Sequence, residues 1–198
     1  MTDPSREDDP LALFRSWYEA AAGAEIDKPN AMTLATVGLD DRPKARIVLL
    51  SSFDERGLVF HTNYLSAKGR ELERVPWAAL VFWWDPLGWQ VRVEGRVEKT
   101  SGEESDAYFA GRPRGSQIGA WASAQSEVLD GRATLEAAVE EYARRFAGAP
   151  VPRPQHWGGY RVVPERWEFW IARADRLHDR FAYDRHDSGG WCRRRLAP

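Results

Sequence analysis

The sequence predicts a mainly β protein with inserted helices (α+β), built as a β-barrel of antiparallel strands decorated by helices. Six or more short runs are rich in β-branched residues or alternate between apolar and polar side chains, as strands do. The helical stretches are inserted between these runs without the regular strand–helix alternation of a βαβ sheet. Neither GxGxxG nor GxxxxGKS/T occurs, so the chain lacks the usual phosphate-binding loops.

Length and composition favour a single domain, residues 1–198. Hydrophobic residues make up 43% of the chain and charged residues 29%, so it can bury a core, and no Pro- or Ser-rich linker divides it. The net charge of −2 argues against nucleic acid or an anionic membrane as the main partner. No histidine lies at HxxxH or HExxH spacing and Cys192 has no cysteine neighbour, which argues against a metal site.

The N-terminal sequence and the cysteine count bear on location. MTDPSREDDP is acidic where a secretory signal would be basic, and no apolar run is long enough to cross a bilayer. The lone Cys192 cannot form an internal disulfide. We therefore expect a cytoplasmic protein that is not bound to membranes.

The first half of the chain predicts two helices around three strands. Apolar residues at spacings of three and four predict an amphipathic helix over 9–23. A second, short helix is expected over 66–76, with Ser66 as its N-cap. DERG at 54–57 has the composition of a hairpin turn. The expected strands cover residues 31–38, 45–52 and 57–62.

The second half returns to β structure on both sides of a helical region. WAALVFWW at 77–84 is apolar throughout and predicts a central strand that is buried on both faces. Residues 89–100 alternate, with valines on one face and charges on the other. Helices are expected over 102–110 and 132–147. The C-terminal strands, about 158–198, are expected in the runs GGYRVVP, ERWEFWIAR, RLHDRFAYDR and WCRRRLAP.

RPRGSQIGAWASAQS at 112–126 lies between the two later helices and is unusually rich in polar side chains for a turn-rich run. It contains two arginines, two glutamines and three serines, broken by a proline and two glycines. Such a set suits an anion with several oxygens, or a flat heteroaromatic ring with polar edges. Tyr108, Arg112 and Ser116, spaced four apart, could converge on a phosphate if the chain bends at Pro113.

Two further constellations suit an anion. If RLHDR lies in a strand, Arg176, His178 and Arg180 project from one face, and two guanidinium groups flank an imidazole. The exposed polar face of an edge strand would have the same pattern. SAK at 66–68 places a lysine at a helix N-terminus, which favours anions, although many helices begin in this way.

RPRGSQIGAWAS with the following QS, the preceding Tyr108-Phe109, HWGGYRVVPERWEFW, RLHDR and RRLAP occur in order along the chain. Together, these motifs resemble the pyridoxine/pyridoxamine 5′-phosphate oxidase family, from about residue 30 to the C-terminus. The resemblance implies an FMN-binding split β-barrel of antiparallel Greek-key type, active as a homodimer with the flavin at the subunit interface. It also implies oxidation of pyridoxine or pyridoxamine 5′-phosphate to pyridoxal 5′-phosphate, in which a hydride passes to the flavin and dioxygen reoxidises it to give hydrogen peroxide.

The resemblance also implies roles for individual residues. Those expected to hold FMN are Arg46, Thr62, Lys68, Gln90, Gln125, Ser126, Trp170 and Arg180. Those expected to bind the substrate are Ser51, Tyr108, Arg112 and Ser116 at its phosphate, with Arg176 and His178 as the catalytic pair over its ring. The motif at 112–126 would then serve two anions, the substrate phosphate at its start and the cofactor at its end.

Three departures from the family pattern keep other functions open. The family usually has a lysine for the substrate phosphate where Ser51 stands and often an arginine where Ala67 stands, and its N-terminal arm over the substrate is largely absent here. The flavin half of the pattern is thus better preserved than the substrate half. One alternative is an FMN-dependent oxidase of another aromatic substrate, as in phenazine biosynthesis. The other is a non-enzymatic module that binds FMN or pyridoxal phosphate.

Overall fold

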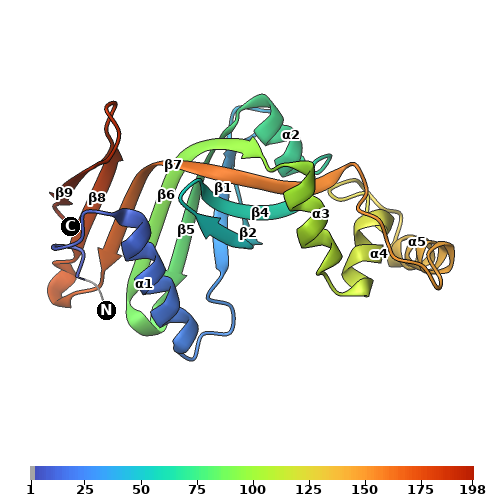
Figure 1. Cartoon of the computed structure of the whole chain (residues 1–198), viewed down its shortest axis with the longest axis horizontal. Coiled ribbons are helices and arrows are strands. Elements are labelled where there is room, and N and C mark those ends of the chain that lie inside the picture. Colours follow the sequence, from blue (N-terminus) through green and yellow to red (C-terminus); the bar gives the residue numbers. More distant parts are fainter. Residues whose placement is uncertain (1–2) are drawn as a thin grey trace.

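One antiparallel sheet dominates the computed structural model, which describes residues 3–198. Its nine strands in that range are β1 Ala31–Val37, β2 Pro43–Leu49, β3 Ser52–Asp54, β4 Gly57–Asn63, β5 Trp77–Trp84, β6 Trp89–Lys99, β7 Trp157–Ile171, β8 Asp179–Arg185 and β9 Trp191–Leu196. The order is β2-β1-β5-β6-β7-β4-β3, with β8 beside β7 and β9 beside β8. Figure 1 shows the curled sheet, with β7 running along the long axis of the molecule. The mainly β architecture with inserted helices is confirmed.

Helices decorate the sheet at both ends (Figure 1). In residues 3–198 they are α1 Pro10–Gly23, α2 Ala67–Arg74, α3 Gly102–Ala110, α4 Arg114–Ala122 and α5 Arg132–Arg145. Asp9, Ser66 and Ser101 cap α1, α2 and α3 by accepting a backbone N–H of the first turn, which has no partner inside the helix. Every helix predicted from the sequence forms. α4 was not predicted, because its proline and glycines favoured turns.

None of these helices, within the described range, is long and apolar enough to span a membrane. α1 instead packs on the sheet, where Phe14 and Trp17 are fully buried. Trp17 stacks on Trp89 of β6 with ring centroids 4.6 Å apart, and Phe14 lies 5.3 Å from Trp167 of β7. Burying an aromatic side chain of this size stabilises a fold by about 2–3 kcal/mol. The apolar residues whose spacing predicted the first helix therefore also form its buried face.

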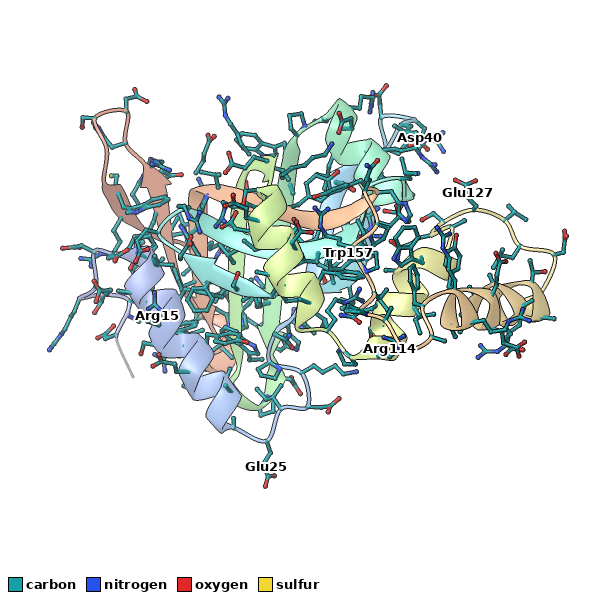
Figure 2. All side chains as sticks on the ribbon, turned by 45° about the vertical axis from the view of Figure 1, so that its right-hand side comes forward. Arg15, Glu25, Asp40, Arg114, Glu127 and Trp157 are labelled. Atoms are coloured by element: carbon teal, nitrogen blue, oxygen red, sulfur yellow. The ribbon has the colours of Figure 1, made fainter. Side chains whose placement is uncertain are left out.

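A second, smaller apolar cluster lies where the helical region meets the start of β7. Phe109 of α3, Ile118 of α4, Val151 and Trp157 of β7 are buried together. Figure 2 shows Trp157 near α3 and α4. This cluster holds the motif at 112–126 against the sheet.

The prediction that residues 77–84 are buried on both faces is wrong. β5 is central in the sheet, between β1 and β6, but its side chains alternate between buried and accessible. Trp84 is 1% exposed, whereas Trp77 and Trp83 are 40% and 50% exposed. The core covers only one face of this strand, and an apolar composition does not reveal which faces are covered.

The two runs expected as separate strands at 158–164 and 165–173 form the single strand β7. Pro164 lies opposite Gly95 of β6, where the pairing of the two strands shifts register. A Cβ added to Gly95 would lie 1.9 Å from the Val163 carbonyl oxygen, so this close approach requires glycine. The bulge accommodates a proline that cannot donate to the ladder, and the strand continues past it.

The predicted strand 45–52 is also corrected. β2 ends at Leu49, and Ser52 begins the short strand β3. β3 pairs with β4 through the DERG turn, where Asp54 is the partner of Gly57. The hairpin is therefore as expected, but its first strand is a new element and not the end of β2.

Candidate active site

A cavity of about 280 Å³ lies where β2, β4, α2 and α3 approach one another. Its wall contains three side chains expected to hold the cofactor and three expected to bind the substrate. They are Thr62, Lys68 and Gln125 for the cofactor, and Ser51, Tyr108 and Arg112 for the substrate. The fold thus brings residues from distant parts of the chain to one place, as the motifs required.

Lys68 is at the centre of the polar groups that are expected to hold the cofactor. Its Nζ lies 3.2 Å from Thr62 Oγ1 and 3.3 Å from Gln125 Oε1. Burial lowers the pKa of Lys68, and the nearby charge of Arg46 lowers it further. Lys68 forms no ion pair within residues 3–198, so its charge is available to an added anion.

The end of the motif at 112–126 lies over the N-terminus of α2. The Ser126 Oγ accepts a hydrogen bond from the Ala67 N–H at 3.1 Å, and Thr62 Oγ1 donates to Gln125 at 3.1 Å. Ser126 has a φ of 79°, an uncommon conformation for serine. These contacts hold Gln125 and Ser126 on β4 and α2, although they are far away in sequence.

Arg46 lies beside this group and not in the cavity wall. Its guanidinium forms an ion pair with Glu71 of α2 at 2.7 Å and donates to Thr36 of β1. The Glu71 side chain is 6% exposed and also accepts from the Thr36 hydroxyl at 2.6 Å. A buried carboxylate therefore holds Arg46 in place, and its positive charge lies close to Lys68.

The bend that Tyr108, Arg112 and Ser116 required is present. α3 ends and α4 begins on either side of Pro113, which is the N-cap residue of α4. The three side chains therefore do not lie along one straight helix. Tyr108 and Arg112 line the 280 Å³ cavity, and Ser116 lines an adjoining cavity of about 250 Å³ that shares Arg112 and Gln125 with it.

Arg112 is the cation among the cavity residues that are expected to bind the substrate. Its guanidinium lies 4.4 Å from the ring centroid of Trp157, a cation–π distance. Its Nη1 is buried and has no hydrogen-bond partner in the described part of the chain. Buried guanidinium groups ordinarily have partners, so the donor capacity of Arg112 is not fully used by the described residues.

His61 of β4 lines the same cavity, and the sequence analysis did not assign it to the site. Its ring stacks on Tyr108, with centroids 3.7 Å apart and planes 6° from parallel. Its Nδ1 lies 2.8 Å from the Ser51 Oγ. Burial lowers the pKa of His61 to about 4, with a contribution from the charge of Arg112, so the ring is neutral at pH 7. No motif surrounds His61, and only its packing marks it.

The remaining expected cofactor residues lie on another part of the sheet. Gln90 of β6 pairs with Trp170 of β7, and Trp170 pairs with Arg180 of β8, so they form one row across three strands. Along β7, Trp170 lies twelve positions after Gly158, the partner of Thr62. Among the described residues, no hydrogen bond, ion pair or ring contact joins this row to the cavity.

The row is held by contacts of its own. Arg180 forms an ion pair with the buried Glu168 at 2.8 Å, which raises the pKa of the guanidinium. The His178 ring lies 4.3 Å from the Trp170 ring, and His178 is half-buried. An aromatic side chain, an imidazole and a guanidinium thus lie together at the end of β7.

The prediction that RLHDR lies in a strand is wrong for its first half. Arg176 ends a 3₁₀ turn with a φ of 59°, and β8 begins only at Asp179. The Arg173 N–H donates to His178 Nδ1 at 3.2 Å and the Arg173 guanidinium pairs with Asp179 at 2.7 Å, which closes the turn. Arg176, His178 and Arg180 therefore do not project from one strand face, and Arg176 is exposed.

Comparison with known families identifies the relatives of this chain. Residues 18–145 match the family profile described as Pyridoxamine 5′-phosphate oxidase, and residues 157–198 match the profile described as Pyridoxine 5′-phosphate oxidase C-terminal dimerisation region. This chain belongs to the pyridoxamine 5′-phosphate oxidase family. The resemblance drawn from the motifs is confirmed, and with it the expectation of an FMN-dependent oxidoreductase on a split β-barrel.

Individual relatives agree with this family. Proteins of Burkholderia multivorans and Gloeothece citriformis, both named pyridoxine/pyridoxamine 5′-phosphate oxidase, are 59% and 52% identical to this chain. The alignments cover 96% of this chain and 89% of the first relative, and 100% of this chain and 92% of the second. The structure of PhzG from Burkholderia lata 383 with tetrahydrophenazine-1-carboxylic acid is 35% identical, with a TM-score of 0.91 over 98% of this chain and 94% of PhzG. A pyridoxamine 5′-phosphate oxidase-related, FMN binding protein from Nostoc punctiforme shares the fold, with a TM-score of 0.77 at 17% identity over 96% of this chain and 98% of that protein.

Two departures from the pattern of the pyridoxamine 5′-phosphate oxidase family occupy different places. Ser51 lies in the cavity wall and is bonded to His61. Ala67 is the first residue of α2, and its backbone N–H donates to Ser126. Only the departure at Ser51 changes a side chain that lines the cavity.

The lowered pKa of His61 predicts a pH-dependent stability. In the unfolded chain the ring titrates near 6.5 and in the folded chain near 4, so the unfolded chain binds more protons between these values. Stability should therefore rise with pH across this window and be complete above it. We expect His61 to account for about 1–2 kcal/mol between pH 4 and pH 7, since partial solvent access screens the effect.

Denaturant unfolding at both pH values measures this contribution. The difference in unfolding free energy between pH 7 and pH 4 should be smaller in His61→Phe than in the unsubstituted protein. His186→Phe, at an exposed histidine, is the control and should leave the difference unchanged. The same difference in His61→Phe and in the unsubstituted protein would contradict the prediction.

Proposed function

We propose that this protein oxidises pyridoxine 5′-phosphate and pyridoxamine 5′-phosphate to pyridoxal 5′-phosphate, with FMN as cofactor and dioxygen as electron acceptor. The observation that carries the proposal is a pair of cations at one cavity. Lys68 and Arg112 both line it, and neither forms an ion pair within residues 3–198. Two phosphate groups, one on the cofactor and one on the substrate, would supply the missing counter-charges.

The groups around Lys68 fit the phosphate and ribityl part of FMN. Lys68 and Arg46 supply two positive charges, and Thr62, Gln125 and Ser126 supply neutral hydroxyl and amide groups. A phosphate dianion needs such a combination of charge and directed hydrogen bonds. When bound, FMN accepts a hydride from the substrate carbon and passes the electrons to dioxygen, which becomes hydrogen peroxide.

On the substrate side, Arg112 would supply the charge for the phosphate of the B6 vitamer. Tyr108 of α3, Ser116 of α4 and Ser51 between β2 and β3 would add hydroxyl groups from the two adjoining cavities. Contacts to a phosphate that is remote from the reacting carbon serve to orient the ring toward the cofactor. The chain's own residues therefore bind and position, and the cofactor supplies the redox chemistry.

A partner subunit would complete the site. Within residues 3–198, no hydrogen bond, ion pair or ring contact joins the row of Gln90, Trp170 and Arg180 to the cavity. A homodimer could place the row of one protomer against the cavity of its partner, with the flavin at the interface. The match of residues 157–198 to a dimerisation region supports this arrangement, because it contains Trp170 and Arg180.

The same arrangement gives a place to the two residues expected to be catalytic. Arg176 and His178 lie in the turn before β8, next to the row and within the dimerisation region. In the dimer they would lie over the substrate ring. Ile47 and Leu49 of β2 are 65% and 49% exposed in one chain, and this apolar area suits burial against a second copy.

An anaerobic titration of the FMN-loaded protein with pyridoxine 5′-phosphate tests the proposed function. The flavin absorbance should bleach as substrate is added, and pyridoxal 5′-phosphate and hydrogen peroxide should appear when air is admitted. A flavin that stays oxidised in the presence of both phosphorylated vitamers would overturn the proposal.

A second candidate is an oxidase of another aromatic substrate, of the kind found in phenazine biosynthesis. The similarity to PhzG in complex with tetrahydrophenazine-1-carboxylic acid favours it, as does Ser51 in place of a phosphate-binding lysine. Bleaching by a reduced phenazine carboxylate, and not by the vitamers, would select this candidate. A flavin that neither compound bleaches would favour a non-enzymatic FMN or pyridoxal phosphate binding module.

Lys68→Met should weaken FMN binding by about 10- to 100-fold, because a charge-assisted contact to the cofactor phosphate is lost. Quenching of flavin fluorescence on addition of apoprotein measures the dissociation constant. Lys99→Met is the matched control, because the Lys99 side chain is 46% exposed and already pairs with Glu73 at 2.9 Å. Equal loss of FMN affinity in the two variants would contradict the assignment of Lys68 to the cofactor phosphate.

A further inference from the structure

Ser51 and His61 form a hydrogen-bonded pair in the wall of the cavity. The Ser51 Oγ lies 2.8 Å from His61 Nδ1, and both side chains line the cavity with Tyr108 and Arg112. A hydroxyl group can donate or accept a hydrogen bond, whereas an anion needs donors only. Whether the Ser51 hydroxyl can donate a hydrogen bond to an anion therefore depends on whether His61 Nδ1 carries a proton.

The orientation of the His61 ring is set by its packing. Tyr108 stacks on it at 3.7 Å, and Trp157 is nearly parallel to it at 5.3 Å and 17°. Trp157 lies only 6.2 Å from Tyr108, so Tyr108 covers one face of the His61 ring and Trp157 lies beside it. Tilting the ring would break the stacking contact with Tyr108, and the contact with the Ser51 Oγ keeps Nδ1 on that side of the ring.

The position of the proton on the ring follows from the other nitrogen. A neutral imidazole carries one N–H and one lone pair, and His61 is neutral at pH 7. His61 Nε2 is buried and has no hydrogen-bond partner among the described residues. A buried N–H without an acceptor is rarer in proteins than a buried acceptor without a donor, so the proton belongs on Nδ1.

This proton position decides the role of Ser51. The Nδ1–H donates to the Ser51 Oγ, which leaves the hydroxyl hydrogen free to point into the cavity. In the opposite tautomer Ser51 would donate to Nδ1, and only oxygen lone pairs would face an anion. We infer that His61 is a positioning residue for substrate binding, which holds the Ser51 hydroxyl as a hydrogen-bond donor toward the phosphate of the substrate. This inference rests on the proposed function, which supplies that phosphate.

Arg112 gives the pair its place in the site. Arg112 and Ser51 both line the cavity, so one phosphate could accept hydrogen bonds from both side chains. Arg112 supplies the charge, and the neutral Ser51–His61 pair adds a directed donor. The pair thus favours a phosphorylated substrate over its unphosphorylated form.

Steady-state kinetics of the FMN-loaded enzyme with pyridoxine 5′-phosphate test the pair. Ser51→Ala should raise KM about tenfold and change kcat less than twofold, since a contact remote from the reacting carbon is lost. His61→Gln, whose amide lies beyond the Nδ1 position, should raise KM to the same extent. His61→Asn, whose amide lies near that position, should keep KM within threefold.

The double variant decides whether the two residues act together. If His61 acts through Ser51, His61→Gln should raise KM no further in the Ser51→Ala background. Additive effects of the two substitutions, or equal KM values for the Asn and Gln variants, would overturn the inference.

Nitrogen-15 NMR of histidine-labelled holoenzyme tests the proton position directly. The chain has four histidines, and the signals lost in His61→Asn identify His61. A proton on Nδ1 supports the inference, and a proton on Nε2 overturns it. This measurement needs no turnover, so it separates two failures. An enzyme that does not oxidise pyridoxine 5′-phosphate contradicts the proposed function, whereas the tautomer alone reports what His61 offers to Ser51.

Discussion

Arg112→Ala is expected to lower kcat/KM for pyridoxine 5′-phosphate by about 100-fold, equivalent to about 2.7 kcal/mol of binding free energy. Arg112 lines the cavity, where we propose that it binds the substrate phosphate, and its buried Nη1 has no hydrogen-bond partner within residues 3–198. Its loss would leave the substrate phosphate with neutral donors only. The change should fall mainly on KM, because the phosphate is held at a distance from the reacting carbon. Steady-state assays of peroxide or pyridoxal phosphate formation measure both constants.

Arg114→Ala is the matched control for this prediction. Arg114, labelled in Figure 2, begins α4, and its guanidinium donates to the carbonyl oxygens of Ala149 and Phe146. It lines neither of the two cavities, so kcat/KM should stay within about threefold. Comparable losses in the two variants would mean that the effect comes from the helical region as a whole and not from phosphate binding.

Arg161→Ala is expected to lower the free energy of unfolding by about 3 kcal/mol. The Arg161 side chain is 3% exposed and pairs with Asp54 at 3.0 Å and Glu104 at 2.8 Å, so it joins β7 to the β3–β4 hairpin and to α3. Arg56 also pairs with both carboxylates, which keeps the loss at the lower end for a broken buried ion pair. Denaturant unfolding at fixed protein concentration measures it.

Arg96→Ala provides the comparison on the same part of the sheet. The Arg96 side chain is 77% exposed and forms one ion pair, with Glu165 at 3.0 Å. An exposed pair of this kind contributes about 0–1 kcal/mol. A loss for Arg161→Ala no larger than that for Arg96→Ala would contradict the stabilising role of the buried cation.

Local sequence patterns predicted most helices and strands of this fold. Which faces of those elements are buried depends on tertiary contacts, which the patterns do not show. The helical period at 9–23 and the alternation at 89–100 both appear in the structure with the expected buried faces. Whether each face of β5 is buried depends on which elements pack against it, and an apolar run in the sequence does not show this. Within the motif at 112–126, Arg114–Ala122 form a helix that begins directly after Pro113, because proline is tolerated at the start of a helix.

The candidate site was predictable where chemistry is tied to motifs. Thr62, Lys68 and Gln125 meet Tyr108 and Arg112 in one cavity, as the ordered motifs implied. The motifs could not predict the turn before β8, because it is closed by contacts of Arg173 that the spacing of RLHDR does not reveal.

His61 could not be found from sequence for a different reason. An isolated histidine in a strand has many possible roles, and its role here comes from Ser51 and Tyr108, which belong to other elements. A departure from the family pattern at a neighbouring position is the sequence signal that could have pointed to His61. A changed residue such as Ser51 directs attention to whatever its new side chain touches.

The continuous strand β7 limits how this protein can change. Trp157, at one end, supports Arg112, and Trp170, near the other, lies in the row expected to meet the partner subunit. Inserting or deleting one residue between them would turn every side chain beyond that point to the opposite face of the sheet. If the row meets the cavity of the partner subunit as we propose, β7 can change in composition but not in length, because its length sets the spacing between Trp157 and Trp170.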